Sequence, residues 1–282
     1  MQVFTQRREI KTQVANWRKN NLTVGYVPTM GALHTGHGSL VDQAIAQCDR
    51  VVVGIFVNPT QFNNADDLEK YPRNTQADID FLQPFGNSLI IFIPDAKEVY
   101  GDEVKSLHFN FGELENKMEG KFRPGHFDGV GTVLKHLFEI VTPNKAFFGE
   151  KDFQQLQIVK KLVEIEQINT QIIPCPISRA EDGLALSSRN TRLTPAQRAV
   201  APFIFKTLTT LKEKFVWLSP KELKQWAEAQ FEDQEELELE YIEIADEETL
   251  NTAHTIDNNK TYRAFIAVFA GDVRLIDNLR LN

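Results

Sequence analysis

The chain has 282 residues, enough for one large or two modest domains with a buried core. It carries 31 Lys and Arg residues against 39 Asp and Glu residues, and this net charge of −8 argues against a nucleic-acid binder. The two cysteines, Cys48 and Cys175, lack metal or redox spacing and are expected to be reduced core thiols. Because we find neither a signal-peptide pattern nor a membrane-spanning run, we expect a cytoplasmic protein that does not bind membranes, and the net charge leads us to expect no nucleic-acid partner.

A strand-to-helix junction near the start of the chain carries the clearest functional signal. The β-branched, apolar run Val24–Pro28 predicts a buried strand, and a helical pattern begins at Gly36. Gly31 and Gly36 permit a tight turn between them, in which backbone amides can approach a ligand. His34 and His37 therefore lie at a helix N-terminus, whose unpaired N–H groups favour a bound phosphate. The alternative is that the glycines only make a turn and the histidines are solvated.

The segments around this junction predict a parallel α/β sheet. An opening helix is expected over residues 9–20, and a second buried strand over Val51–Val57. Strand, helix and strand make a βαβ unit, and ligands of such sheets bind at the carboxyl ends of the strands. The histidine turn and the segment Asn58–Phe62 both lie at that edge. Residues 63–73 are polar, and we expect a mobile loop or short helix there that serves as a lid.

The remainder of residues 1–176 continues the alternation of helices and strands. Apolar periodicity predicts further helices at 78–82, 128–141 and 152–163, and apolar runs predict further strands at 89–93, 145–148 and 172–175. A weak alternation over His108–Phe111 predicts a short strand. His136 falls off the apolar stripe of its helix, and we expect a surface residue with no role. Pro174 and Pro176 favour a domain boundary after residue 176.

Residues 177–282 are predicted to form a smaller α+β domain, because helices come first and strands later. One helix is expected from about Thr194, with Pro195 at its first position, and a second from Ser219–Pro220. The expected strands lie at 237–244, at 262–269 and, after a turn at Gly271–Asp272, at 274–276.

Two further clusters combine residue types that suit phosphate binding. Gly149–Asp152 repeats the order of strand, glycine and helix N-terminus. Lys151 is a point charge suited to phosphates, although a solvated lysine is the usual alternative. Asp152 suits either ribose hydroxyls or a helix cap. Leu186–Arg189 offers two hydroxyls and a guanidinium, a weak signal alone that gains weight beside the other clusters.

Two glutamines placed after strand ends or early in a helix suit a small hydroxylated carboxylate, and two basic side chains lie in another segment. Gln61 and Gln155 are neutral hydrogen bonders, for which solvation is the alternative. Arg123 and His126 lie in a basic, turn-rich segment. They can orient a carboxylate or phosphate, or form a structural ion pair.

Six motifs, in this order, resemble those of the pantothenate synthetase (pantoate–β-alanine ligase) family. H-T-G-H has the His-x-Gly-His form of the nucleotidylyltransferase superfamily, to which that family belongs. The motifs cover nearly the whole chain and read P-T-M-G-A-L-H-T-G-H, F-V-N-P-T-Q-F, Y-P-R, R-P-G-H-F-D-G-V, F-F-G-E-K-D-F-Q-Q-L and L-S-S-R-N. The resemblance implies a Rossmann-like α/β domain over 1–176 that holds the nucleotide and pantoate. It also implies a smaller domain over 177–282 that closes over the ATP site.

The resemblance also implies roles for individual residues. The residues expected to bind ATP are Met30, Gly31, Ala32, Leu33, His34, Thr35, Gly36, His37, Gly149, Glu150, Lys151, Asp152, Ser178, Leu186, Ser187, Ser188 and Arg189. Gln61 and Gln155 are expected to hold pantoate, with Gln61 also near β-alanine. His37 is the expected proton donor, with His34 and Lys151 as further catalytic residues. The family usually has an apolar residue at position 178 and a larger apolar residue at position 38. Ser178 and Gly38 depart from this pattern, and Gly38 is expected to loosen its helix.

The implied reaction is an ATP-dependent ligation. The carboxylate of (R)-pantoate attacks the α-phosphate, pyrophosphate leaves, and the amine of β-alanine then attacks the pantoyl adenylate to release pantothenate and AMP. Mg²⁺ is an implied cofactor with unknown ligands, and a homodimer is the implied assembly. The alternatives are a transferase that stops at a nucleotidyl product and a catalytically silent nucleotide binder. The intact set of His34, His37, Lys151, Ser188 and Arg189 argues against a silent protein.

Overall fold

The computed structural model describes residues 1–62 and 68–282 of the chain. They divide into two compact units. The first contains Met1–Glu150 and Gln154–Pro176, and the second contains Lys151–Phe153 and Ile177–Asn282. In the described residues, no helix combines the length and apolar character needed to cross a membrane. Positions 63–67 of the predicted lid segment lie outside the described residues, so the lid stays a prediction.

A six-stranded parallel sheet forms the centre of the first unit. Its strands follow the order β1-β4-β3-β2-β5-β6 and comprise β1 (Gln2–Phe4), β2 (Val24–Thr29), β3 (Arg50–Ile55), β4 (Leu89–Phe92), β5 (Lys145–Gly149) and β6 (Gln171–Cys175). The central strands are runs of buried apolar residues, as expected for a parallel sheet covered on both faces. Thr29 at the end of β2 pairs with Ile55 at the end of β3. The chain therefore leaves both strands at the same edge, where the site residues follow.

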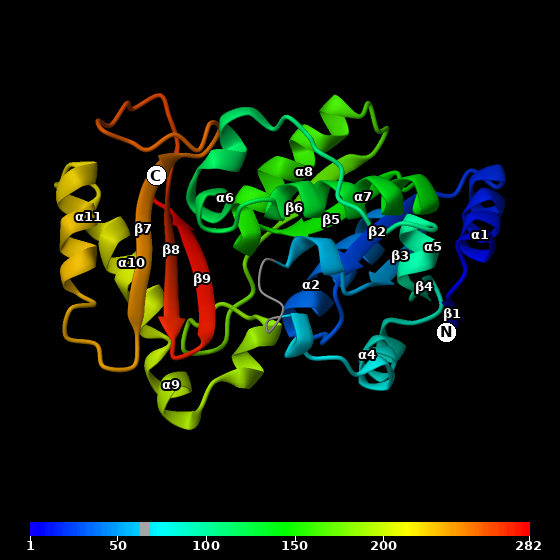
Figure 1. The fold of residues 1–282 in the computed structure, drawn as a ribbon, viewed down its shortest axis with the longest axis horizontal. Helices are drawn as coiled ribbons and strands as arrows, with labels where there is room; N and C mark the ends of the chain where they lie inside the picture. The colour runs from blue at the N-terminus through cyan, green and yellow to red at the C-terminus, as the bar shows by residue number, and fades with distance from the viewer. Residues whose placement is uncertain (63–67) are drawn as a thin grey trace. The chain divides into compact units, whose positions relative to one another are not determined.

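Helices connect the strands of this sheet along the chain (Figure 1). They are α1 (Arg7–Lys19), α2 (Thr35–Gln47), α4 (Thr75–Leu82), α5 (Ala96–Tyr100), α6 (Met118–Phe122), α7 (His126–Val141) and α8 (Phe153–Ile165), of which Phe153 belongs to the second unit. Short 3₁₀ turns lie at η1 (Pro59–Gln61), η2 (Gln83–Phe85), η3 (Gly112–Asn116) and η4 (Glu150–Asp152). Val41 of α2 and Leu82 of α4 pack in one hydrophobic cluster with Val27 and Val53 of the sheet. The helices α1, α2, α4, α7 and α8 were predicted from the sequence, whereas α5 and α6 were not.

Two local predictions for the first unit were wrong, and one strand was not predicted. His108–Phe111 forms no strand; Phe109 and Phe111 are buried and their rings stack at 5.5 Å, so burial of two rings produced the alternation. His136 is half-buried, with its ring 5.4 Å from the ring of Tyr100 in an edge-on contact, and this burial lowers its pKa. Strand β1 was not predicted, because three residues carry too little periodicity to be recognised.

The second unit combines a three-stranded antiparallel sheet with helices on one side (Figure 1). Its strands are β7 (Glu238–Asp246), β8 (Tyr262–Ala270) and β9 (Val273–Arg280), and its helices are α9 (Pro195–Val200), α10 (Phe203–Lys214) and α11 (Pro220–Ala229), with a 3₁₀ turn η5 (Ser188–Arg192). Thr194 and Ser219 cap α9 and α11 in capping boxes, as their sequences indicate. The helix expected from Thr194 is two helices, because Pro202 lacks the N–H that a continuous helix needs.

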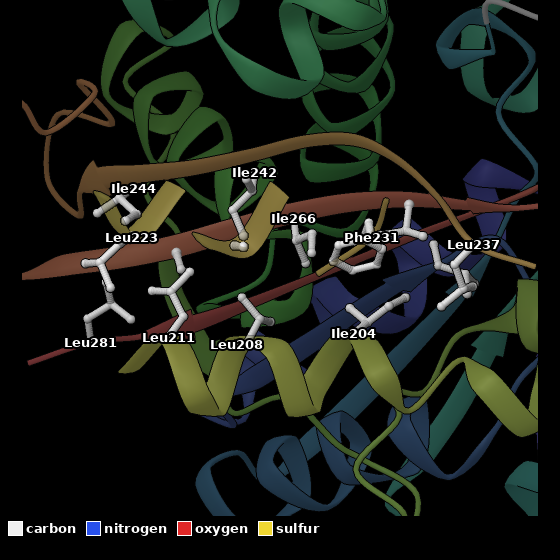
Figure 2. Packing of buried hydrophobic residues seen from close by; sticks show 14 of the residues in the cluster. Ile204, Leu208, Leu211, Leu223, Phe231, Leu237, Ile242, Ile244, Ile266 and Leu281 are labelled. Atoms are coloured by element: carbon white, nitrogen blue, oxygen red, sulfur yellow. The ribbon is translucent and has the colours of Figure 1, made fainter. Parts of the chain in front are cut away.

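Side chains of α10 and of the sheet interlock in this unit's core. Figure 2 shows Ile204, Leu208 and Leu211 of α10 directed toward the strands that carry Ile242 and Ile266. All five residues are buried. The predicted fold class is therefore confirmed: a parallel α/β sheet of Rossmann-like organisation and a smaller α+β part built on an antiparallel sheet.

Candidate active site

The turn that joins β2 to α2 is held in a strained but well-connected conformation. Gly31 and Ala32 have φ values of 79° and 50°, in the left-handed region that favours glycine. A Cβ atom on Gly31 would lie 2.9 Å from a carboxylate oxygen of Asp78, so no larger residue fits there. Thr29 Oγ1 accepts a hydrogen bond from Gly31 N at 3.2 Å and donates one to the carbonyl of Gly54 at 2.8 Å. The turn is thereby tied to the ends of both central strands.

Asp78 of α4 stabilises this turn through hydrogen bonds to its backbone. Its carboxylate accepts hydrogen bonds from Ala32 N at 3.1 Å and from Leu33 N at 2.7 Å, and only 4% of the residue is exposed. Burial raises the pKa of Asp78, while the two backbone N–H groups act in the opposite direction. The sequence contained no signal for this residue, because it lies 41 positions after His37 and resembles any acidic residue in a first helical turn.

His34 and His37 form the two halves of a capping box at the start of α2. Nδ1 of His34 accepts a hydrogen bond from Gly36 N at 3.1 Å, and Nδ1 of His37 accepts one from His34 N at 3.3 Å. Their ring centroids are 4.1 Å apart. Since Nδ1 of each ring is an acceptor, each neutral ring carries its proton on Nε2. The helix cap thus selects the tautomer in which both rings present an N–H donor on the side away from the backbone.

Gly38, where the family usually has a larger apolar residue, is buried in α2. A Cβ atom there would meet the rings of Phe85 and Phe81 at 3.2 and 3.3 Å. Two aromatic side chains therefore fill the space that a larger residue at position 38 would occupy.

Gln61 lies at the end of β3 with its side-chain orientation determined by neighbours. It is 9% exposed, and its Oε1 accepts a hydrogen bond from Asn58 Nδ2 at 3.2 Å. Its Nε2 points toward Met30 Sδ, 2.9 Å away. The structure thus brings three residues of two predicted motifs, Met30, Asn58 and Gln61, into direct contact at one sheet edge. Asn58 was quoted within a motif but was not singled out, since its role depends on contacts with residues far along the chain.

Arg123 and His126 contact the protein itself. His126 is 5% exposed and its Nδ1 donates to the carbonyl of Gln61 at 2.8 Å, while Arg123 Nη1 donates to His126 Nε2 at 3.3 Å. Arg123 also lies 3.8 Å from the carboxylate of Glu119. These bonds favour the structural alternative: the pair fixes the backbone of Gln61.

Two adjacent glutamines at the start of α8 have different environments. Gln154 is 3% exposed, accepts from Glu119 N at 3.0 Å, and donates to the carbonyls of Leu114 and Lys117 at 2.7 and 2.8 Å. Gln155 is half-buried, and none of the hydrogen bonds within the described residues uses its side chain. Gln154 therefore serves the fold, and Gln155 keeps its amide available to a ligand.

The second unit contains Lys151, Asp152, Ser178 and Leu186–Arg189, whereas Gly149 and Glu150 belong to the first unit. Lys151 lies in η4 and its carbonyl accepts a hydrogen bond from Asn278 Nδ2 at 2.8 Å, whereas Asp152 is exposed. Ser178 and Leu186 pair through a backbone hydrogen bond of 2.9 Å across a short hairpin. A backbone contact at position 178 is thus independent of its side chain.

The L-S-S-R-N segment forms the 3₁₀ turn η5. Ser187 caps it by accepting from Arg189 N at 3.3 Å, and Ser188 is 8% exposed. Lys151, Ser187 and Asn190 line the same small cavity of this unit. Among the described residues, Asn190 Oδ1 is a buried oxygen without a hydrogen-bond partner. This cavity has about the size of one water molecule, so a single water can donate to the unpaired oxygen of Asn190.

The chain is similar to known proteins along its whole length. A family model described as pantoate-beta-alanine ligase matches residues 2–280. Pantothenate synthetase of Christiangramia forsetii is 50% identical over 282 residues, all of both chains. Pantothenate synthetase of Flavobacterium psychrophilum is 49% identical over 281 residues.

Solved structures agree with the sequence comparisons. The crystal structure of pantothenate synthetase from Thermus thermophilus superposes with a TM-score of 0.92 at 36% identity and covers 100% of this chain and 99% of that one. Pantoate-beta-alanine ligase from Francisella tularensis, complexed with beta-gamma ATP and beta-alanine, has a TM-score of 0.82 at 37% identity and covers 100% and 98%. By sequence and by fold, this chain belongs to the pantoate–β-alanine ligase family.

Proposed function

We propose that this chain condenses (R)-pantoate with β-alanine through a pantoyl-adenylate intermediate, with ATP as the co-substrate. The observation that supports this most directly is the paired histidine cap of α2. It places two imidazole N–H donors at a helix N-terminus, where negative charge is favoured. Membership of the pantoate–β-alanine ligase family supplies the reaction. The residue roles below are our proposal for this chain.

In the first step, a carboxylate oxygen of pantoate attacks the α-phosphorus of ATP and the bond to pyrophosphate breaks. Negative charge grows on the phosphate oxygens during this transfer. Nε2–H of His37 and of His34 donates a hydrogen bond to those oxygens, and pyrophosphate leaves as an anion; the donor role expected of His37 is this hydrogen bond, because the neutral ring has no second proton to release. The rings need no rearrangement for this, since the cap already holds both tautomers in place. Met30, Gly31, Ala32, Leu33, Thr35 and Gly36 supply the backbone of the same turn.

Pantoate is held by two glutamine amides of the first unit. Gln61 is fixed by Asn58 so that its NH₂ group is available to an oxygen acceptor. Gln155 offers a second amide without a protein partner among the described residues. A hydroxy acid supplies both hydroxyl and carboxylate oxygens, so it suits these donors better than an ammonium group would.

The other ATP-binding residues act through charge and hydroxyl groups. We assign phosphate binding to Lys151, Ser187, Ser188 and Arg189. Asp152 is assigned to the ribose, and Gly149, Glu150, Ser178 and Leu186 to contacts with the rest of the nucleotide. The exposure of Asp152 leaves its carboxylate accessible to a ligand.

In the second step, the β-alanine amine attacks the acyl carbon of the adenylate, the bond to AMP breaks, and the amine loses a proton. Both nucleophiles come from substrates, so positioning and electrostatic stabilisation suffice and no covalent protein intermediate is needed.

The described residues include no group of three or more His, Cys, Asp or Glu side chains that could hold a metal ion. A protein-built Mg²⁺ site therefore does not fit them. We propose Mg²⁺ only as a partner of the ATP phosphates, which commonly supply most of its ligands, and no step above depends on it. A homodimer is proposed from the family resemblance alone, and a cytoplasmic location from the sequence features described above.

The decisive experiment measures exchange of labelled pyrophosphate into ATP with pantoate present and β-alanine absent. Exchange is expected, because adenylation precedes entry of the amine. Exchange that requires β-alanine would exclude the two-step mechanism. Exchange only with another acceptor would indicate a nucleotidyltransferase, and none under any condition would indicate a silent nucleotide binder.

A further inference from the structure

Asn58 lies at the centre of a hydrogen-bond network that no predicted role explains. It is 1% exposed, and both ends of its amide are fully engaged. Its Oδ1 accepts from the hydroxyl of Tyr100, from Thr60 Oγ1 at 3.0 Å and from Thr60 N at 3.3 Å. Its Nδ2 donates to Gln61 Oε1 at 3.2 Å and to the carbonyl of Gly129 at 3.1 Å.

This pattern permits only one orientation of the Asn58 amide. If the amide were rotated by 180°, Nδ2 would face the N–H of Thr60, and Oδ1 would face the carbonyls of Gln61 and Gly129. The rotated amide would therefore place two N–H groups opposite each other and carbonyl oxygens opposite each other. These groups are buried, so water could not satisfy them. The orientation of Asn58 in turn determines that of Gln61, whose Oε1 must accept the bond from Asn58.

Tyr100 supplies a donor that helps to select this orientation. It is the last residue of α5, and its ring contacts the rings of Phe56 and His136. Burial raises the pKa of Tyr100, so the phenol keeps its proton at neutral pH and can donate it. Thr60 Oγ1 lies 2.9 Å from the same hydroxyl. Two hydroxyl groups thus converge on one carbonyl oxygen.

The geometry around Gly129 holds the network together. A Cβ atom at this position in α7 would lie 2.3 Å from the carbonyl oxygen of Thr60, so the helix approaches η1 closely only because residue 129 is glycine. This approach brings the Gly129 carbonyl within reach of Asn58. Tyr100, Thr60 and Gly129 come from three separate segments, and the order in sequence does not reveal their contact.

We propose that Tyr100 is a positioning residue for the acid substrate, acting through Asn58 so that Gln61 presents its NH₂ group, and not its carbonyl, to the ligand. The network therefore selects oxygen acceptors, such as the hydroxyl or carboxylate of a hydroxy acid, at this side of the site. The proposal rests on the assignment of Gln61 to pantoate binding made above. Tyr100 itself touches neither reacting group.

The test compares Tyr100→Phe with Tyr26→Phe, because both variants lose one buried phenol oxygen. Tyr26 hydroxyl has no hydrogen-bond partner among the described residues and serves as the matched control. In Tyr100→Phe the KM for pantoate is expected to rise about fivefold, the effect of one lost buried hydrogen bond. The KM for ATP and the kcat are expected to change by less than about twofold. Tyr26→Phe should leave all three at wild-type values.

A double-mutant cycle separates a relay through Asn58 from a general loosening of the site. On an Asn58→Ala background, Tyr100→Phe should add no further rise in the KM for pantoate. A full additional effect would overturn the relay. Equal KM values for pantoate in Tyr100→Phe and Tyr26→Phe would overturn the proposal itself. Should Tyr100→Phe fail to fold, Thr60→Val removes the other hydroxyl donor, and the same rise or its absence decides the question.

The outcome also distinguishes this inference from the proposed function. A wild-type protein that forms no pantothenate from ATP, pantoate and β-alanine would refute the function. A wild-type protein that forms it, with an unaffected Tyr100→Phe variant, would refute only the positioning role.

Discussion

The His37 ring has two proposed roles, capping α2 through Nδ1 and donating to the phosphate through Nε2. Two substitutions at this position can test them separately. Its Nδ1 accepts the hydrogen bond from His34 N at 3.3 Å, and its Nε2 is the proposed donor to the phosphate. Asn at this position can place an oxygen near the site of Nδ1, so His37→Asn keeps the cap and loses the distal donor. Gln reaches further, so His37→Gln places an amide N–H near the site of Nε2 and weakens the cap.

The two functions differ in magnitude. One cap hydrogen bond of this length contributes about 0.5–1 kcal/mol to the free energy of unfolding. A preorganised donor to a developing phosphate charge contributes about 3 kcal/mol to the transition state, which corresponds to a hundredfold or more in rate. His37→Asn is therefore expected to keep nearly all of its stability and to lose roughly a hundredfold in rate. His37→Gln is expected to lose a fraction of a kcal/mol in stability and only about tenfold in rate.

Pyrophosphate exchange with pantoate measures the rate, and urea denaturation measures the free energy of unfolding. A wild-type exchange rate in His37→Asn would show that Nε2 takes no part in adenylation. Equal losses of exchange in two folded variants, His37→Asn and His37→Gln, would refute the division of the ring into a capping nitrogen and a donating nitrogen.

Three further predictions follow from particular contacts. Gln155→Ala is expected to raise the KM for pantoate about fivefold and to leave the KM for ATP unchanged. Gln154→Ala should instead lower the free energy of unfolding by about 2–3 kcal/mol, because it leaves buried backbone groups unpaired. The reverse pattern would show that the two glutamines were assigned wrongly. Tyr26→Phe is expected to leave the free energy of unfolding unchanged or to raise it by up to about 1 kcal/mol, because the buried hydroxyl has no partner among the described residues; a clear loss in urea denaturation would mean that it has one. Burial raises the pKa of Asp78, so the folded protein holds this proton more tightly than the unfolded chain, and that contribution to stability is lost as the pH rises through the raised pKa. The free energy of unfolding of the wild type, relative to Asp78→Asn, should therefore fall as the pH rises above the ordinary pKa of an aspartate; a rise would show that the hydrogen bonds from Ala32 and Leu33 outweigh burial.

Local sequence patterns were sufficient for much of the fold. Continuous apolar runs predicted β2, β3 and β4, and the helical stripe of α7 is buried as its spacing indicates. Such patterns work because burial on one or both faces imposes a period that neighbouring residues share. They failed where burial came without regular structure, as at Phe109 and Phe111, and where an element was too short, as at β1.

The candidate site divides in the same way. The histidine pair and its glycines are recognisable from the sequence, because residues close in the chain form a turn at a strand end, whereas the role of Gln61 was implied only by the family resemblance. What the histidine rings can donate was decided by the capping bonds to both Nδ1 atoms. Which glutamine of the pair at 154 and 155 is available was decided by contacts with residues 114–119.

The residues that orient the site depended entirely on tertiary structure. Asp78 lies far along the chain from the turn that it braces, and Tyr100 and Gly129 lie 42 and 71 positions from Asn58. Each is an ordinary residue in its own segment, so no local period marks it. Hydrogen bonding requires atoms within about 3 Å, and only the packing of α4, α5 and α7 against the sheet edge brings these groups to that distance. The sequence by itself determined which chemical groups the site contains, and the tertiary packing determined how these groups are oriented.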